Sequence, residues 1–224
     1  ITSKEGSLQL EMVSATRQFG FLPYSDRGTL SSIMSLVKDD IPVIVFQNLS
    51  IQLLPQWHYA VVIGFDSDKG TVTLHTGLTP NHEMSLELFE RTWGRGNYWY
   101  LAPVPPNVTS PEMTPFTYVS AAYDMLKVGD KARSLAFLET ASHTWPTYWL
   151  SYFLIANYYL EQNDNQAVAW FEKGYEVGQH QHVYVHNYVL ALRENNMPEK
   201  ANTILKQGLE RFPNNEPLLT LAEK

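Results

Sequence analysis

The sequence contains no cysteine. A chain without thiols forms no disulfide, has no thiolate for a zinc site and offers no cysteine nucleophile. It also has no run of lysine or arginine, and its formal net charge is −7. Because binding to nucleic acid or to an anionic membrane needs concentrated positive charge, the sequence argues against both as partners.

Long apolar runs are missing as well. A membrane-spanning helix needs roughly 18 or more consecutive apolar residues, so we expect no transmembrane segment in this chain. Hydrophobic residues nevertheless make up 44% of the 224 residues and charged residues only 17%, a balance typical of packed domains. The sequence starts at Ile1 with no signal-peptide pattern, and we interpret it as a fragment or processed form of a longer protein.

A cluster of prolines divides the chain. Proline fixes φ and lacks the backbone N–H, so we expect neither a helix nor a central strand to continue through the cluster. We therefore predict a linker over 103–116, between a first domain over 1–102 and a second over 117–224. The prolines are Pro103, Pro105, Pro106, Pro111 and Pro115.

The first domain has the mixed pattern of an α+β fold. Ser7, Thr29 and Ser85 are candidate N-caps of three helices, the first closed by Gly20. Short β-branched or alternating runs predict an antiparallel sheet of at least four strands, two of them joined as a hairpin by a polar turn over 66–70. The expected strands are 42–46, 58–65, 71–76 and 98–101.

The second domain has a repeat and no strand pattern. The small residues Ser134, Ala167 and Ala201 are spaced by 33 and 34 residues. Turn signals recur with them, at 129–130, 163–164 and 195–196. A period near 34, with small residues where two helices cross closely, resembles the tetratricopeptide repeat. We therefore expect three antiparallel helix pairs and a capping helix after Pro213, in a domain that binds a protein partner.

Aromatic and histidine residues of the second domain each permit two interpretations. The aromatic run over 145–171 fits inter-helix packing, and alternatively a concave groove in which some rings face a peptide. His182 and His186 are spaced as i and i+4, which a metal site can use, but no carboxylate follows at a matching turn. We interpret them, with His180, as solvated or packing side chains, and we expect no metal and no cofactor.

One segment of the first domain suggests chemistry. His58 heads an apolar strand, which is how papain-like folds present the general base that takes a thiol proton. The same histidine is also compatible with a structural or surface role, because fold does not fix function. Gln47 ends the preceding strand, where it either caps the structure or serves a polar role.

Three segments together resemble one bacterial family: EGSLQLEM at 5–12, WHYAVVIG at 57–64 and ERTW at 90–93. The family is the papain-like cysteine peptidases similar to the bacteriocin double-glycine processing peptidases, in the branch with a tetratricopeptide tail. The resemblance implies a partial papain-like domain with His58 as general base. It also implies a periplasmic protein or a membrane-anchored lipoprotein of a Gram-negative bacterium, acting on a peptide or protein substrate.

The resemblance leaves the third catalytic residue open. Related double-glycine peptidases place Asp-Pro where this sequence has Thr76-Gly77, so Thr76 is the candidate. Its hydroxyl accepts a hydrogen bond from an imidazole but supplies no negative charge to hold an imidazolium. His75 points to the opposite face by strand alternation. Either the base is oriented more weakly, or another group orients it, or this branch of the family has weak peptidase activity.

The resemblance also implies a missing N-terminal segment. In the family, the nucleophilic cysteine lies on a helix near the N-terminus, within a Gln/Cys/Gly/Pro box, and this helix packs on the sheet. Here the sheet strands are 43–46, 60–65 and 72–76. Because a bare apolar face of this size drives association, we expect a separate nicked fragment, a neighbouring chain or a rearranged domain to cover it.

Two classes of function follow. The first is the C-terminal part of an exported bacterial cysteine peptidase, a hydrolase whose repeats recruit substrate or partner. The second is a non-enzymatic scaffold that binds a peptide or protein and carries a degenerate peptidase-like domain. A cysteine encoded upstream of this sequence favours the first class.

We predict that this chain alone shows no thiol-dependent peptidase activity, because it has no thiol and no Ser/His/Asp arrangement replaces one. The measurement is incubation of the pure chain with peptides, with and without iodoacetamide. Cleavage that iodoacetamide blocks would contradict the prediction.

Overall fold

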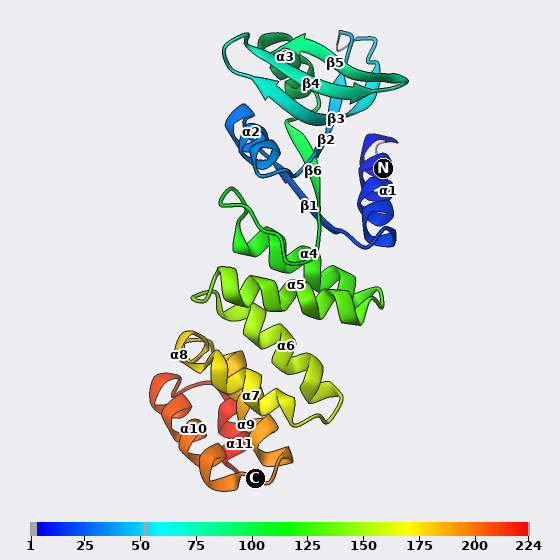
Figure 1. Cartoon of the computed structure of the whole chain (residues 1–224). Coiled ribbons are helices and arrows are strands. Elements are labelled where there is room, and N and C mark those ends of the chain that lie inside the picture. Colours follow the sequence, from blue (N-terminus) through cyan, green and yellow to red (C-terminus); the bar gives the residue numbers. More distant parts are fainter. Residues whose placement is uncertain (1–3, 52, 224) are drawn as a thin grey trace. The chain divides into compact units, whose positions relative to one another are not determined.

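The computed structural model describes the backbone of residues 4–51 and 53–223. The chain forms two compact units, Ile1–Arg133 and Ser134–Lys224 (Figure 1). The elements of the first unit are α1 (Lys4–Gln18), β1 (Leu22–Arg27), α2 (Leu30–Lys38), β2 (Val43–Asn48), β3 (Trp57–Asp66), β4 (Thr71–Thr76), β5 (Thr79–Ser85), α3 (Leu86–Arg95), β6 (Trp99–Val104) and α4 (Pro115–Lys127).

The strands of the first unit form a six-stranded antiparallel sheet in the order β1-β6-β2-β3-β4-β5. The α+β class and the antiparallel sheet are therefore confirmed. All four predicted strands are present, although the last starts at Trp99. β1 and β5 were not predicted. Both are edge strands, and β5 is exposed along most of its length, so it lacks the apolar alternation that a strand buried on one face shows.

Helices cover both faces of the sheet. Gln47 donates a hydrogen bond to Thr92 of α3, so α3 lies on the face of β2 that also carries Val43 and Val45. α2 contacts β2 and β3. On the opposite face, Met12 and Val13 of α1 pack against a small core of Phe46, Trp99 and Leu101. Figure 1 shows α1 and α2 on opposite sides of the sheet.

On one side of the sheet, helices of this chain cover the apolar face for which we expected a nicked fragment, a neighbouring chain or a rearranged domain. Six apolar strand residues on this side are at most 2% exposed, because they pack beneath α2 and α3. These residues are Val43, Val45, Ala60, Val62, Val72 and Leu74. On the other side, Val61 and Ile63 are half-buried.

Two of the three predicted N-cap residues cap the start of a helix. Thr29 caps α2 through a capping box with Ser32, and the Ser85 hydroxyl accepts from the Leu88 N–H at the start of α3. Ser7 does not cap α1, because this helix already begins at Lys4. Gly20 follows the end of α1 with φ +83°, as a residue without Cβ permits.

The proline-rich stretch is shorter than the predicted linker. Pro103 lies within β6, opposite Pro23 of the edge strand β1, and α4 begins at Pro115. α4 belongs to the first unit: the Thr114 N–H donates to the Tyr24 hydroxyl over 3.0 Å, and Arg17 pairs with Asp124 over 3.3 Å. Because these contacts fix α4 to β1 and α1, the boundary between the compact units falls within α5 and not in the predicted linker.

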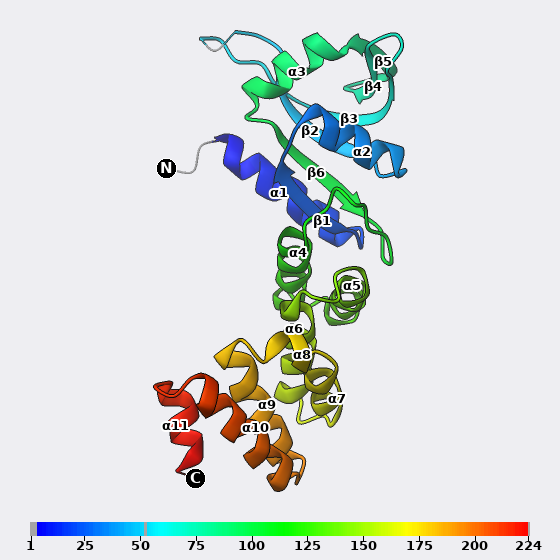
Figure 2. The same ribbon diagram turned by 90° about the vertical axis from the view of Figure 1, so that its left-hand side faces the viewer.

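Two helix pairs of the second unit recur near the predicted period (Figure 2). α6 packs on α7 and α9 on α10, while α11 packs on both α9 and α10. The short α8 was not predicted. The helices are α5 (Lys131–Thr144), α6 (Trp149–Glu161), α7 (Gln166–Lys173), α8 (Tyr175–Gly178), α9 (His182–Glu194), α10 (Pro198–Arg211) and α11 (Glu216–Ala222).

Backbone geometry supports the phase of the repeat. The turns before α5, α7 and α10 contain Gly129, Asn163 and Asn196, which have φ of 103°, 53° and 57°. Each predicted turn thus contains a residue in the left-handed region, where glycine and asparagine are favoured. Ala167 and Ala201 are 1% and 0% exposed, as expected at close helix crossings.

We predict that Ala201→Leu destabilises the second unit by about 1–3 kcal/mol, because added methylene groups overpack a filled core. Thermal and urea unfolding of the purified chain measure the effect. Thr203→Leu is the matched control, since Thr203 lies on the same helix and is exposed. An unchanged stability of Ala201→Leu would show that the repeat phase is wrong.

Candidate functional site

The structure brings the two candidate catalytic residues together. Nε2 of His58 lies 2.6 Å from Oγ1 of Thr76. Thr76 on β4 is opposite Ala60 of β3, and His58 shares the face of Ala60 because strand residues alternate. The prediction that both side chains lie on one face of the sheet is confirmed. Their catalytic role stays a prediction.

His75 lies on the other face, as alternation predicted. It is opposite Val61 in the β3–β4 ladder. Its Nδ1 accepts a hydrogen bond from the Asn81 N–H over 3.2 Å. The Nδ1 atom of His75 therefore accepts a hydrogen bond within the β4–β5 hairpin. His75 does not belong to the polar side chains around His58.

The hydrogen bond to Thr76 leaves one imidazole nitrogen available. Within the part of the chain that the structure describes, Nδ1 of His58 has no hydrogen-bond partner. If Nε2 carries the proton and donates it to Thr76, then Nδ1 presents its lone pair. An imidazole held in this tautomer is suited to take a proton from a nucleophile placed at Nδ1.

Gln47 is the third polar side chain on this face. It lies directly opposite His58 in the β2–β3 ladder and is 1% exposed. Its Nε2 donates to Oγ1 of Thr92 over 2.8 Å. From the sequence, Gln47 was expected either to cap the structure or to serve another polar role. In the structure it ties β2 to α3.

His58 is half-buried, outside the main core, as predicted. Gly77 follows Thr76 with φ +56°, and a Cβ at this position would lie 3.9 Å from Cε1 of His58. One side of the imidazole therefore faces a residue without a side chain. His58 does not line the pocket of about 250 Å³ beside α1 or that of about 290 Å³ between α1 and α4, so its place at the mouth of a cleft stays a prediction.

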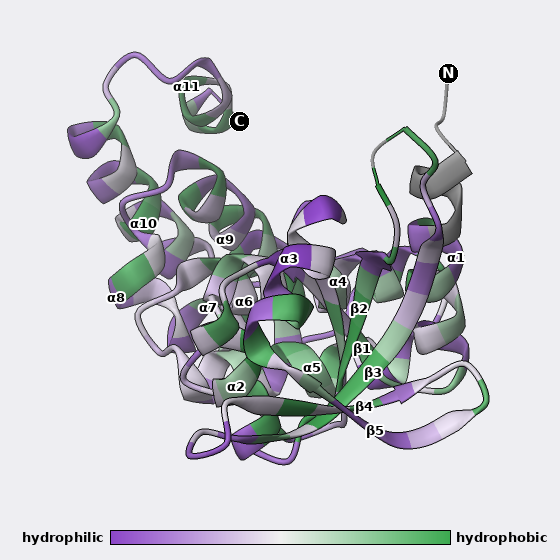
Figure 3. Cartoon of the chain, turned by 90° about the horizontal axis from the view of Figure 1, so that it is seen from above, coloured by the Kyte–Doolittle hydropathy of each residue, from purple (hydrophilic) through white to green (hydrophobic). Residues whose placement is uncertain are grey.

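An apolar loop leaves the sheet next to His58. Its large side chains are exposed, and none of its residues is charged. Figure 3 colours the loop between β2 and β3 largely in the green of hydrophobic residues. The loop is held by polar contacts: Arg95 donates to the Ser50 carbonyl over 2.8 Å, and the Asn48 side chain accepts from the Gln56 N–H over 3.0 Å. The exposed residues are Leu49, Ile51, Leu53 and Leu54, and Trp57 at the start of β3 is also exposed.

Aromatic rings fill the opposite face of β3. Phe46 stacks on Trp57 with centroids 4.8 Å apart, and Tyr59 meets the edge of Trp99. The Tyr59 hydroxyl is buried and has no hydrogen-bond partner among the described residues. Burial raises the pKa of Tyr59 to about 12, and the negative charge of Glu11 adds to this shift.

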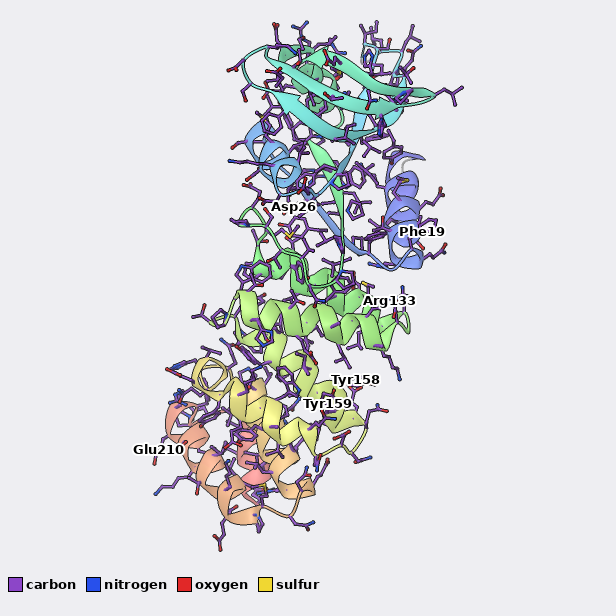
Figure 4. All side chains as sticks on the ribbon, in the orientation of Figure 1. Phe19, Asp26, Arg133, Tyr158, Tyr159 and Glu210 are labelled. Carbon is purple, nitrogen blue, oxygen red and sulfur yellow. The ribbon has the colours of Figure 1, made fainter. Side chains whose placement is uncertain are left out.

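Most aromatic rings of the second unit pack within it. Tyr152, Phe171 and Tyr184 belong to its buried core, and Trp149 and Phe153 pack against that core. The packing interpretation therefore applies to these rings. Tyr158 and Tyr159 are half-buried on α6 (Figure 4).

The histidines of the second unit do not form a metal site. His186 contacts the Asn187 side chain over 2.8 Å, while His182 is exposed beside the Phe212 ring. Among the described residues, no group of three or more histidine, aspartate or glutamate side chains is placed to hold a metal ion.

A polar contact joins the first helices of two repeats. Asn187 of α9 donates to Oδ1 of Asn157 on α6 over 2.7 Å. Sequence reasoning did not identify this contact. The two residues are 30 positions apart, short of the repeat spacing of 33 and 34, so the period gave no signal for it.

Comparison with known proteins does not identify a family for this chain. No protein-family model matches the chain, and no curated protein matches it. A solved structure described as "Crystal structure of MamA protein" matches with 16% identity and a TM-score of 0.39, over 44% of this chain and 54% of that chain. The described helices include none with the length and apolar character needed to cross a membrane.

We predict that Tyr59→Phe does not destabilise the chain at pH 7, because the buried hydroxyl that it removes has no partner. The raised pKa adds an alkaline effect. The unfolded tyrosine ionises near pH ~10, whereas folded Tyr59 ionises at about 12. The stability from neutral Tyr59 is therefore complete below the unfolded pKa and is lost as pH rises toward the folded pKa.

Urea unfolding at pH 7 and in the alkaline range tests both effects. Tyr59→Phe should lose less stability than the unsubstituted chain as pH rises. Glu11→Gln should give a smaller improvement, because it removes the second cause of the shift. An alkaline loss of the same size in Tyr59→Phe would assign that loss to another group.

Proposed function

We propose that the chain is the C-terminal part of a bacterial papain-like cysteine peptidase whose helical repeats bind a peptide or protein partner. The observation that carries this proposal is the hydrogen-bonded pair of His58 and Thr76, with Nδ1 of His58 unpartnered in the described structure. The resemblance of segments 5–12, 57–64 and 90–93 to the double-glycine processing peptidases supports the same assignment.

In the proposed reaction, His58 is the general base. Nδ1 takes the proton from a cysteine thiol, and the thiolate attacks the carbonyl carbon of the scissile peptide bond. The protonated imidazole then gives its proton to the leaving amine. Water hydrolyses the resulting thioester and restores the thiol. Since this sequence contains no cysteine, the thiol would come from residues outside it.

Thr76 orients the base in this proposal. Its hydroxyl accepts from Nε2 and holds the imidazole in the tautomer that leaves Nδ1 free. A hydroxyl is neutral, so it fixes orientation without the charge that an aspartate would supply. Thr76 therefore matches the family's third residue in position but not in electrostatics.

The proposed role of the second unit is recruitment. Paired helices of this kind stack into extended surfaces that suit a peptide or a protein. The polar contact between Asn157 and Asn187 joins successive repeats, which favours a rigid surface over independent helix pairs. The family resemblance further suggests a periplasmic protein or a membrane-anchored lipoprotein of a Gram-negative bacterium.

A non-enzymatic scaffold is the alternative. The neutral hydroxyl of Thr76 in place of a carboxylate favours it, because a degenerate site no longer needs to stabilise an imidazolium. In this alternative the repeats carry the function, and the first unit binds peptide without cleaving it.

The test uses the protein expressed from its whole coding sequence, with its cysteine present. We expect His58→Ala to lower kcat by ~10²–10⁴, the range typical of losing a general base. His75→Ala is the matched control, because His75 lies on the opposite face of the same sheet. An unchanged rate in His58→Ala, or a coding sequence without any cysteine, would reject the peptidase and leave the scaffold.

A further inference from the structure

A groove of about 830 Å³ runs along α10 in the second unit. Its large apolar side chains are Leu205 and Leu209 of α10, and Ala222 of α11 also lines it. The polar lining includes Asn202 of α10 and Arg193 at the end of α9. All of these residues belong to the second unit, so the groove is defined within one compact unit.

A shift of 34 residues relates the packing of α11 on α10 to packing in the preceding repeat. α9 begins at residue 182 and α11 at residue 216, 34 positions later. Gly174 lies next to Tyr184 of α9, and a Cβ on this glycine would meet the tyrosine hydroxyl at 2.5 Å. Gly208, 34 positions later, lies next to Leu218 of α11, where a Cβ would meet Cδ1 at 3.6 Å. α11 therefore takes the place relative to α10 that α9 takes relative to α7 and α8.

In the preceding repeat, a tyrosine ring fills the space that corresponds to the groove. Tyr188 of α9 lies against Phe171 and Tyr175, and its ring centroid is 5.6 Å from the centroid of each. Aromatic rings at such separations attract each other beyond the area that they bury. Tyr188 is 1% exposed, so its ring closes the contact between these helices.

The groove exists because smaller side chains stand at the corresponding positions. The two rings that contact Tyr188 are replaced by Leu205 and Leu209, and Tyr188 itself by Ala222, each 34 residues later. Leu205 is 5% exposed, whereas Ala222 is exposed. A methyl group thus stands where a ring stood one repeat earlier, and the remaining space opens to the surface. Its place and its apolar walls suit one aromatic side chain.

The charges at the groove favour an acidic partner. Arg193 and Lys206 carry positive charges and Glu210, labelled in Figure 4, a negative one, although the chain as a whole carries −7. Arg193 donates to the Leu221 carbonyl over 2.8 Å, which fixes its guanidinium at the end of α11. Lys206 is exposed and takes part in none of the ion pairs among the described residues. A carboxylate beside the aromatic ring would therefore meet an unpaired cation.

We propose that this groove binds an aromatic side chain on an acidic helix of a protein partner, in the place that Tyr188 takes one repeat earlier. Leu205 and Leu209 contact the ring, and Lys206 and Arg193 attract a carboxylate next to it. The proposal rests on the proposed function in one respect, that the second unit binds a partner. It does not depend on the peptidase reaction.

The first probe is p-cresol, the isolated side chain of tyrosine, added to the whole 224-residue chain. Proton–nitrogen correlation NMR follows the backbone amide signals. We expect saturable shifts at Leu205, Leu209 and Ala222, because these residues line the groove. Ala167 is the internal reference. It is 1% exposed in the preceding, filled repeat, so its signal should not shift.

The second probe is an alanine-based helical peptide that carries one tyrosine and, one turn away, one glutamate. We expect it to displace p-cresol, and the same peptide with alanine in place of tyrosine should not. Replacing its glutamate with glutamine should weaken binding about two- to fivefold, the effect of losing an exposed ion pair. In Lys206→Ala this replacement should have a much smaller effect. Lys38→Ala is the matched control, because Lys38 is an exposed lysine of the first unit.

A variant that fills the groove from within tests its location. Ala222→Tyr restores a ring at the position that corresponds to Tyr188, so we expect it to abolish binding of p-cresol. Thr220→Tyr is the matched control. Thr220 is exposed on the same helix and does not line the groove, so this variant should bind p-cresol as before. If Ala222→Tyr does not fold, Asn202→Tyr serves instead, since Asn202 is exposed and lines the groove.

The proposal is overturned if p-cresol causes no saturable shifts at the groove, or if its binding persists in the filling variant. Binding of p-cresol without binding of the peptide would reject a helical partner. Groove signals that broaden with rising protein concentration in the absence of a probe would identify a second copy as the occupant and also overturn the proposal. None of these measurements uses peptidase activity, so a failure here leaves the assignment of His58 intact, and the reverse also holds.

Discussion

The antiparallel register of β2, β3 and β4 determines which side chains lie next to His58. Gln47 lies opposite His58 on one side, and Thr76 is reached diagonally across the other ladder. A slip of one residue in either ladder would turn one of these polar groups to the far face of the sheet. The same slip would expose Val43, Val45 or Val62, which are at most 1% exposed. Burial of these apolar side chains beneath α2 and α3 therefore also keeps the polar groups around His58 in place.

Sequence reasoning succeeded where structure depends on residues close in the chain. Counting alternation along two neighbouring strands was enough to place His58 and Thr76 on one face. The contact between Gln47 and Thr92 was not predictable in this way, because it joins residues 45 positions apart through the docking of α3. β1 and β5 were missed for a related reason. Their pairing with neighbouring strands creates them, and their own side chains have no apolar period.

The repeat was predictable because its signals are local and recur. Left-handed turn residues and small buried residues both follow the period near 34, and each is set by steric requirements within one helix pair. The short helix α8 does not follow this period. Gly174 precedes it and Gly178 is its last residue, and a Cβ on either would lie 2.5 Å from atoms of the Tyr184 side chain. A large buried ring thus requires two glycines nearby, and the short helix runs from one to the other. No period in the sequence marks such an insertion.

The side chain that hydrogen-bonds His58 is neutral, which affects how the imidazole would act as a base in the proposed reaction. A carboxylate beside an imidazole stabilises the charged form at all times and raises its pKa strongly. The Thr76 hydroxyl orients the ring and supplies no charge. A neutral imidazole can accept a proton, whereas an imidazolium already holds one. The positive charge would then arise when a thiol gives up its proton, and the thiolate formed in that step would itself balance it. In the proposed peptidase, the nucleophile itself would then supply the balancing charge that a related enzyme supplies as a fixed carboxylate.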